Sequence, residues 1–430
     1  EMTSSLVGSE MCIRDRNKVV KVIGAACCAS MLFGLAACSG GGSSAGDVEL
    51  EFMTGMATGS TQLKAMTKVV DAFEKENPTV KVTLVPGTSS YESDLKVRLA
   101  GKNEPDLRNT HGWSRDRYAD FLEPLQNRSW AKDMSSVIDT AIRKSDKSFY
   151  ALPLDVAVTG IIYNTTVLDK AGVDPTAIST WDEFDAACKK IVATGANCIA
   201  ASGKDNWTVG NIADYTASGM YTEAQLKKLK SGSFDEASYE KAVTPIYQWA
   251  RNKYFNVDYT SATADDVAKL AATDKVGFVI QPNSFAQSVQ SYNADTKLGL
   301  MPLPSAVGDP YLVTGEDYAI GASKTGKNKE IALKLIDFMA EPANMKGLSD
   351  TTGNAPAISG VEANIGQLKD TYDYWVDEKK TQTYPIFDRV YLPNGMWNTL
   401  CTTTDGLLTG QSNPGNAASQ MKTSFESLYG

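Results

Sequence analysis

Several large aromatic side chains lie in stretches rich in Gly, Asn and Asp, where no apolar helix face needs them. These residues are Trp113, Trp207, Trp397, Tyr215 and Tyr318. Flat apolar rings can cover the C–H face of a sugar ring, while carboxylates and amides hydrogen-bond the hydroxyl groups around its edge. Core packing explains each tryptophan taken alone equally well, because Trp is largely buried in most proteins. As a group, these residues predict a site for a polyhydroxylated ring.

A single histidine, His111, limits the acid–base chemistry that this chain can support. It excludes metal sites and acid–base pairs built on two imidazoles, including the HExxH zinc helix. A Ser-His-Asp triad would have to use His111, and no neighbouring residue marks a nucleophile. A pair of carboxylates for glycoside hydrolysis stays an open alternative, because the distance between the two groups depends on the fold. We therefore predict no catalytic residue, no metal and no cofactor, and keep a carboxylate hydrolase as an alternative.

The composition narrows the class of protein further. The 430 residues include 42 Lys and Arg against 51 Asp and Glu, which gives a formal net charge of −9 at pH 7. This balance argues against nucleic-acid binding, because contacts to phosphates need a basic face. Hydrophobic residues make up 42% of the chain and charged residues 22%, which is typical of a globular protein. The length favours two lobes or domains over one small core.

The first 46 residues have the pattern of an export signal followed by a tether. Basic residues precede an almost uncharged run at 22–37, which ends in Leu-Ala-Ala before Cys38. We interpret 1–37 as a signal peptide, since its apolar run is too short for a comfortable membrane span. Leu-Ala-Ala-Cys resembles the lipobox of bacterial lipoproteins, so we expect a lipid on Cys38 and a flexible Gly/Ser tether through residue 46. Residues 6–16 resemble a translated sequencing adaptor, so we expect the start of the chain to be an artefact.

Three cysteines besides Cys38 follow the predicted signal peptide. Cys188 and Cys198 are ten residues apart, one in a helix-like segment and the other at the start of a strand-like one. A disulfide can persist outside the cytosol, but two buried thiols fit the spacing equally well, so both readings stay open. Cys401 is left unpaired, and we expect it to be buried.

Strand and helix patterns alternate along the rest of the chain. The segment 50–53 reads as a short strand, and a helix is predicted to begin at Ser60 or Thr61. Alternating apolar residues follow at 80–84, and the apolar segment 276–280 is typical of a strand buried on both faces. Strands that alternate with helices predict an α/β fold with parallel pairing.

Short motifs give the chain a family resemblance over nearly all of residues 48–430. They are 150–155 (YALPLD), 161–164 (IIYN), 168–173 (LDKAGV), 180–184 (TWDEF), 199–207 (IAASGKDNW) and 315–320 (GEDYAI). In this order and spacing the chain resembles an extracytoplasmic solute-binding lipoprotein of a bacterial ABC sugar importer, in family 1 of the extracellular solute-binding proteins. It departs from many members at 282–285, where Pro-Asn-Ser-Phe replaces a segment with tryptophan.

The resemblance implies a two-lobed periplasmic-binding-protein fold with hinge-connected lobes and a ligand cleft between them. The N-terminal lobe would hold 47–154 and 304–352, and the C-terminal lobe 155–303 and 353–430. A ligand stabilises the closed form only if it touches both lobes, since equal affinity for two states shifts neither. The resemblance and the aromatic pattern together predict a set of ligand contacts: Trp113, Asp155, Trp207, Tyr215, Asn283, Glu316, Asp317 and Trp397.

The function implied is binding of an extracellular carbohydrate, an oligosaccharide, and its delivery to the permease subunits of an ABC transporter. The protein would be a monomer, exported and lipid-anchored to the outer face of the cell membrane, and its carboxylates would accept hydroxyl hydrogens without proton transfer. Two alternatives stay open. One is a secreted glycoside hydrolase with paired carboxylates. The other is a solute-binding protein for a polyamine, peptide or phosphorylated polyol, although no basic pocket is evident from the sequence.

Overall fold

The computed structural model describes residues 48–88, 91–110 and 117–429. The signal peptide predicted at 1–37, the lipidation predicted at Cys38 and the tether predicted up to residue 46 lie outside the described residues, as do His111 and Trp113. Strands and helices alternate along the described chain and form two lobes, so the predicted α/β class is confirmed. No helix in the described ranges is both long and apolar enough to span a membrane.

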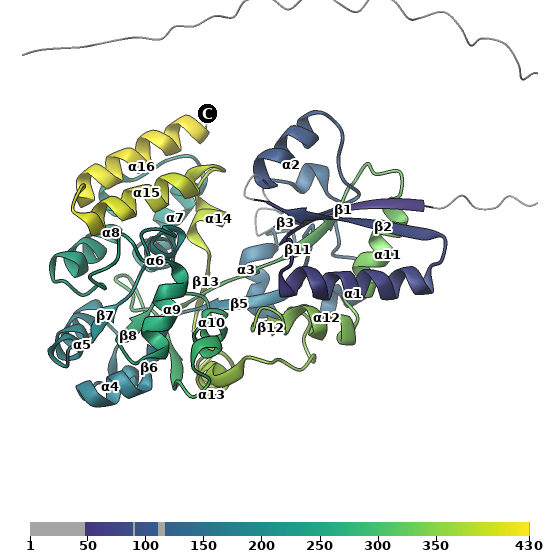
Figure 1. The fold of residues 1–430 in the computed structure, drawn as a ribbon. Helices are drawn as coiled ribbons and strands as arrows, with labels where there is room; N and C mark the ends of the chain where they lie inside the picture. Colours follow the sequence, from purple (N-terminus) through teal and green to yellow (C-terminus); the bar gives the residue numbers. More distant parts are fainter. Residues whose placement is uncertain (1–47, 89–90, 111–116, 430) are drawn as a thin grey trace, which may run out of the picture. The chain divides into compact units, whose positions relative to one another are not determined.

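The first lobe is built on a sheet of five strands in the order β2-β1-β3-β11-β4. Their bounds are β1 Val48–Ala57, β2 Val80–Gly87, β3 Leu107–Thr110, β4 Leu152–Pro153 and β11 Ala319–Ala322. β1 pairs in parallel with β2 and β3, whereas β11 is antiparallel to both β3 and β4. In Figure 1 the green strand β11 lies beside the purple N-terminal strands, so segments from distant parts of the sequence share this sheet.

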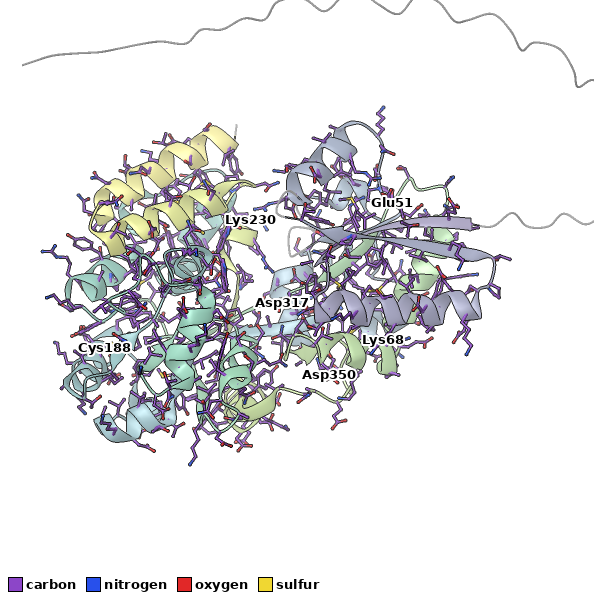
Figure 2. The ribbon with its side chains drawn as sticks, in the orientation of Figure 1. Glu51, Lys68, Cys188, Lys230, Asp317 and Asp350 are labelled. Atoms are coloured by element: carbon purple, nitrogen blue, oxygen red, sulfur yellow. A yellow bond between two sulfur atoms is a disulfide. The ribbon has the colours of Figure 1, made fainter. Side chains whose placement is uncertain are left out.

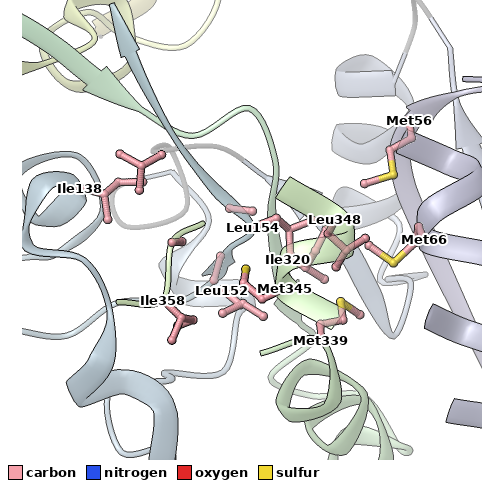
Figure 3. Packing of buried hydrophobic residues seen from close by; sticks show 14 of the residues in the cluster. Met56, Met66, Ile138, Leu152, Leu154, Ile320, Met339, Met345, Leu348 and Ile358 are labelled. Carbon is pink, nitrogen blue, oxygen red and sulfur yellow. The ribbon is translucent and has the colours of Figure 1, made fainter. Parts of the chain in front are cut away.

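Helices cover this sheet with apolar faces, and the helix that the sequence predicts to begin at Ser60 or Thr61 is one of them. α1 (Thr61–Glu76) begins after Ser60, whose side chain accepts a hydrogen bond from the main-chain N–H of Leu63. The other helices of this lobe are α2 (Tyr91–Ala100), α3 (Asp139–Ile142), α11 (Lys329–Met339) and α12 (Pro342–Ser349). Figure 3 shows Met66 of α1 and Met345 of α12 among the buried side chains that pack against this sheet.

The second lobe is built on a four-stranded sheet in the order β7-β8-β6-β9. Its strands are β6 Ile161–Asn164, β7 Asn197–Ile199, β8 Val276–Val279 and β9 Leu298–Met301. The helices of this lobe are α4 Thr165–Ala171, α5 Trp181–Ala193, α6 Trp207–Ser218, α7 Glu223–Lys230, α8 Glu236–Arg251, α9 Ala264–Ala272, α10 Phe285–Tyr292, α13 Lys369–Tyr372, α14 Phe387–Tyr391, α15 Met396–Thr409 and α16 Pro414–Tyr429. A capping box of Thr180 and Glu183 starts α5, where the sequence predicted a helix.

The sequence left two alternatives for Cys188 and Cys198, a disulfide or two buried thiols, and the structure of the second lobe decides between them. Cys188 of α5 and Cys198 of β7 form a disulfide, with their Cα atoms 5.0 Å apart. Cys401 of α15 is a buried thiol. The disulfide therefore fastens a helix to the edge strand of the second sheet.

Strands that run between the lobes form a third sheet, in the order β12-β5-β10-β13. They are β5 Asp155–Thr159, β10 Leu312–Gly315, β12 Ala355–Pro356 and β13 Thr383–Pro385. Only Leu154 separates β5 from β4, and only Gly160 separates it from β6, so one extended segment serves all three sheets. A Cβ atom at Gly160 would lie 2.3 Å from the carbonyl oxygen of Met301, which explains the glycine there. The lobe boundaries given by the sequence stay a prediction.

Candidate functional site

A cleft is lined by residues from both lobes, and it consists of adjoining cavities. One cavity, of about 400 Å³, is bordered by Gln62 and Thr351 of the first lobe and by Trp207 and Tyr215 of the second. A second cavity, of about 670 Å³, shares Gln62, Trp207 and Asp317 with the first. We call these two cavities the cleft. A ligand that filled it would touch both lobes, which is the geometric condition for a ligand-dependent closure.

One face of helix α6 supplies the second-lobe wall of the cleft. Trp207, Asn211 and Tyr215 are four residues apart, a spacing that places side chains on the same face of a helix. Trp207 is the first residue of α6 and is 42% exposed, whereas Tyr215 is buried. The Asn211 amide donates to Gln281 Oε1 at 2.8 Å, which fixes its orientation. The wall thus combines an accessible indole with oriented polar groups.

The sequence predicted that the aromatic residues lie in loops, and this prediction is wrong for three of them. Trp207 and Tyr215 belong to helix α6, and Trp397 belongs to α15. The segment before Trp207 is rich in Gly, Asn and Asp and is typical of a loop, and Asn206 makes no side-chain capping hydrogen bond at the start of the helix. Tyr318 follows β10 and lines the larger cavity of the cleft, in agreement with its assignment to a connecting segment.

Asp317 brings a carboxylate to the cleft from the segment between β10 and β11. Its Oδ2 accepts a hydrogen bond from Asn354 Nδ2 at 2.9 Å, and its main-chain N–H donates to Asp155 Oδ1 at 2.8 Å. Burial raises the pKa of Asp317, and the positive charge of Arg389 opposes this shift. Figure 2 labels Asp317 close to the strands that run between the lobes.

Arg389 is a cationic residue of the cleft that the sequence reasoning missed. It lies in α14, and its guanidinium donates to the main-chain oxygen of Glu316 at 2.7 Å and to Glu316 Oε1 at 3.4 Å. Its side chain is 20% exposed and lines both cavities of the cleft. The cleft therefore contains both an acid, Asp317, and a cation, Arg389, where the sequence indicated no basic pocket.

Three residues predicted as ligand contacts do not line the cleft. Asp155 is fully buried, and its Oδ2 accepts from Asn354 Nδ2 at 3.2 Å. Burial, together with the negative charge of Asp317, raises the pKa of Asp155 to about 7. The Asn283 amide joins Val158 of β5 to Gly353, and Glu316 holds Arg389. Their hydrogen bonds hold strands and loops together next to the cleft. That they contact a ligand stays a prediction.

Trp397 lines a smaller cavity beside the cleft. This cavity, of about 180 Å³, also has Asn211, Tyr215 and Arg389 in its wall. Helices α6 and α15 approach each other closely at Gly210, where a Cβ atom would lie 2.4 Å from Cys401 Sγ and 3.2 Å from the Trp397 ring. The structure thus brings together four of the predicted residues, Trp207, Tyr215, Asp317 and Trp397, around connected cavities.

Nothing in the described ranges provides a metal centre, since no group of three His, Cys, Asp or Glu side chains there is arranged to hold an ion.

Glu92 is a further acid of the cleft, and its Oε2 accepts a hydrogen bond from Tyr118 at 2.7 Å. Burial raises the pKa of Glu92, and nearby positive charges partly counteract this. Taken together, an exposed indole, amides and partly buried charges suit the recognition of a polar ligand with apolar faces.

Comparison with known proteins shows which family has this fold and cleft. The family described as "Bacterial extracellular solute-binding protein" matches residues 57–346. The melibiose/raffinose/stachyose-binding protein MelE of Bacillus subtilis is 31% identical over 383 residues, which cover 86% of this chain and 88% of MelE.

Solved structures agree with the sequence comparison. The binding protein msme of Bacillus subtilis, in an open conformation, superposes with a TM-score of 0.82 at 28% identity, covering 89% of this chain and 97% of the other. A sugar transporter protein of Bacillus licheniformis in complex with stachyose gives a TM-score of 0.77 at 28% identity, covering 89% and 100% of the two chains. The extent of the family match and the identity to MelE show that this chain belongs to the bacterial extracellular solute-binding proteins.

Proposed function

We propose that this protein binds an oligosaccharide in the cleft and hands it, chemically unchanged, to the permease of an ABC importer. The observation that carries the proposal is the wall formed by α6, in which the 42% exposed Trp207 stands beside polar side chains and opposite first-lobe residues. Sugars need both kinds of contact, because their rings have apolar faces and polar edges.

The size of the cleft and the nature of its relatives support an oligosaccharide as the ligand. Adjoining cavities of about 400 and 670 Å³ share their lining residues, which gives room for several sugar rings in a row. MelE binds melibiose, raffinose and stachyose, and the Bacillus licheniformis protein was solved with stachyose. We therefore take short galactose-containing oligosaccharides as the first class to test.

Binding without turnover is the second part of the proposal. The family consists of solute-binding proteins, and the cleft carboxylate of Asp317 already accepts a hydrogen bond from Asn354. In this role Asp317 and Arg389 orient hydroxyl groups and transfer no proton. We further propose that the protein acts as an exported monomer, held at the membrane by a lipid on Cys38.

Titration calorimetry combined with product analysis tests the function. Purified protein is titrated with raffinose, stachyose and melibiose, with maltotriose as a matched control of similar size, and the sugars are then separated by chromatography. We expect one-to-one heat release with at least one galactose-containing sugar and full recovery of that sugar. Release of galactose or new reducing ends would identify a glycoside hydrolase instead, and absence of heat with every sugar would refute carbohydrate binding.

A further inference from the structure

Arg117, in the first-lobe segment after β3, makes hydrogen bonds to the second lobe. Its Nη2 donates to the main-chain oxygens of Leu392 at 3.1 Å and of Asp388 at 3.4 Å. Its Nη1 donates to Asn394 Oδ1 at 3.4 Å. These groups lie in α14 or just after it, outside the connecting sheet formed by β5, β10, β12 and β13. One side chain therefore links the two lobes in addition to the strands that run between them.

Both ends of this link are fixed within their own lobes. Next to Arg117, the buried ring of Tyr118 belongs to a hydrophobic cluster with Leu95 of α2. The Tyr118 hydroxyl also donates to Glu92 Oε2 at 2.7 Å. In the second lobe, Leu392 is buried in the main hydrophobic core of that lobe. Because each end is held by packing, the link breaks when the lobes move apart.

Helix α14 offers Arg117 acceptors that it does not use itself. The last four carbonyl groups of an α-helix have no N–H partner within the helix, and Asp388 is among the last four residues of α14. A basic side chain that binds such carbonyls stabilises the helix end. Burial raises the pKa of Asp388 to about 6, and the positive charges of Arg117 and Arg389 oppose this shift. The carbonyl and the carboxylate of Asp388 thus both attract Arg117.

The link lies beside the cleft and outside its cavities. Glu92, which accepts from Tyr118, lines the larger cavity, and Arg389, the neighbour of Asp388, lines both cavities. Within the described chain, Arg117 lines neither of them. A link on the cleft side of the connecting strands is stretched when the cleft widens. It therefore opposes opening, and a ligand in these cavities does not need to touch it.

We propose that Arg117 is an interlobe latch, which limits how far the lobes open when no ligand is bound. Such a link is formed in one arrangement of the lobes and lost in the other, so it shifts the balance between them. The protein then spends more time near the arrangement that holds a ligand from both sides, which raises its apparent affinity. Arg117 is thus a positioning residue. Its effect on opening does not depend on the proposed function, whereas its effect on sugar affinity rests on that function.

Small-angle X-ray scattering of the unliganded protein tests the latch directly. We expect Arg117→Gln to have a larger radius of gyration than wild-type protein, and Asn394→Ala to show a smaller increase. Arg98→Gln is the matched control, and its radius should equal that of wild type. Arg98 donates to the main-chain oxygen of Asn103 at 2.9 Å and to Glu51 Oε1 at 2.7 Å, so its contacts stay within the first lobe.

Titration calorimetry measures the effect on affinity, with whichever of raffinose, stachyose and melibiose binds wild-type protein most tightly. We expect Arg117→Gln to bind about 3- to 10-fold more weakly, because hydrogen bonds from a partly exposed charged group contribute less than buried ones. Arg98→Gln should bind within twofold of wild type. The double variant Arg117→Gln/Asn394→Ala should bind no more weakly than Arg117→Gln, since both substitutions break the same link.

The scattering result decides the inference. An unchanged or smaller radius for Arg117→Gln overturns the latch, whatever happens to the affinity, and so does an equal increase for Arg98→Gln. If wild-type protein binds none of the sugars, the proposed function fails, and scattering still tests the latch. Thermal melting verifies that the variants fold. If Arg117→Gln does not fold, Asn394→Ala takes its place, and an unchanged radius for that variant overturns the latch.

Discussion

Replacement of Trp207 by alanine is the most direct test of how the cleft holds its ligand. An indole side chain buries about 150–250 Å² when it is covered, and Trp207 is 42% exposed, so a stacked sugar ring can remove roughly 60–100 Å² from water. At about 25 cal/mol per Å², this contact contributes roughly 1.5–2.5 kcal/mol to binding. The dissociation constant should therefore rise about 10- to 70-fold in the variant. Stability should change little, since the lost side chain is only partly packed.

Calorimetric titration of Trp207→Ala, Trp207→Phe and wild-type protein with the same sugar measures this effect. Trp207→Phe keeps a flat ring and should retain most of the affinity. Tyr292→Ala is the matched control, because Tyr292 is 44% exposed but lies at the far end of α10, outside the cavities of the cleft. The stacking argument is refuted if Trp207→Ala binds within twofold of wild type, or if Trp207→Phe is as weak as Trp207→Ala.

Three further predictions concern stability. Removing the Cys188–Cys198 disulfide, which closes a loop with a sequence separation of ten, should lower the free energy of unfolding by about 2–3 kcal/mol in urea titrations, and reductant should do the same to wild-type protein. The pKa of Asp155 is raised to about 7, so the folded state keeps a proton that the unfolded chain has lost above about pH 4. The free energy of unfolding should therefore fall by up to about 1.4 kcal/mol per pH unit between pH 4 and 7, and Asp155→Asn should flatten this slope in urea titrations at several pH values. Gly210→Ala should lower the melting temperature, because its methyl group meets Cys401 Sγ, and Cys401→Ala in the same chain should recover part of the loss in a calorimetric melt.

Many of the helices and strands could be predicted from local sequence patterns. The start of α5 at Thr180, the alternating residues of β2 and the apolar strand β8 all depend on neighbours in sequence, which periodicity and capping describe. The face of α6 could also have been found, since Trp207, Asn211 and Tyr215 follow each other at intervals of four. It was missed because the polar, glycine-containing segment before Trp207 is typical of a loop.

The remainder of the site depends on contacts between distant parts of the chain. Arg389 reaches Glu316, which lies 73 residues away, and Asp388 meets Asp214 across 174 residues. No local pattern reports such pairs. The same limit explains Asp155 and Asn283, because sequence does not distinguish a polar side chain that faces a ligand from one that holds two strands together.

Asp317 has two neighbours at once, the ligand space on one side and Asp155 at the start of β5 on the other. Single residues join β5 to strands of both lobes, so the hydrogen bond from Asp317 to Asp155 ties the cleft to the segment that connects the lobes. Tyr215 of α6 makes a second link, because its side chain is hydrogen-bonded to Thr159 at the other end of β5. A ligand in the cleft therefore contacts two side chains that are held at opposite ends of the segment connecting the lobes.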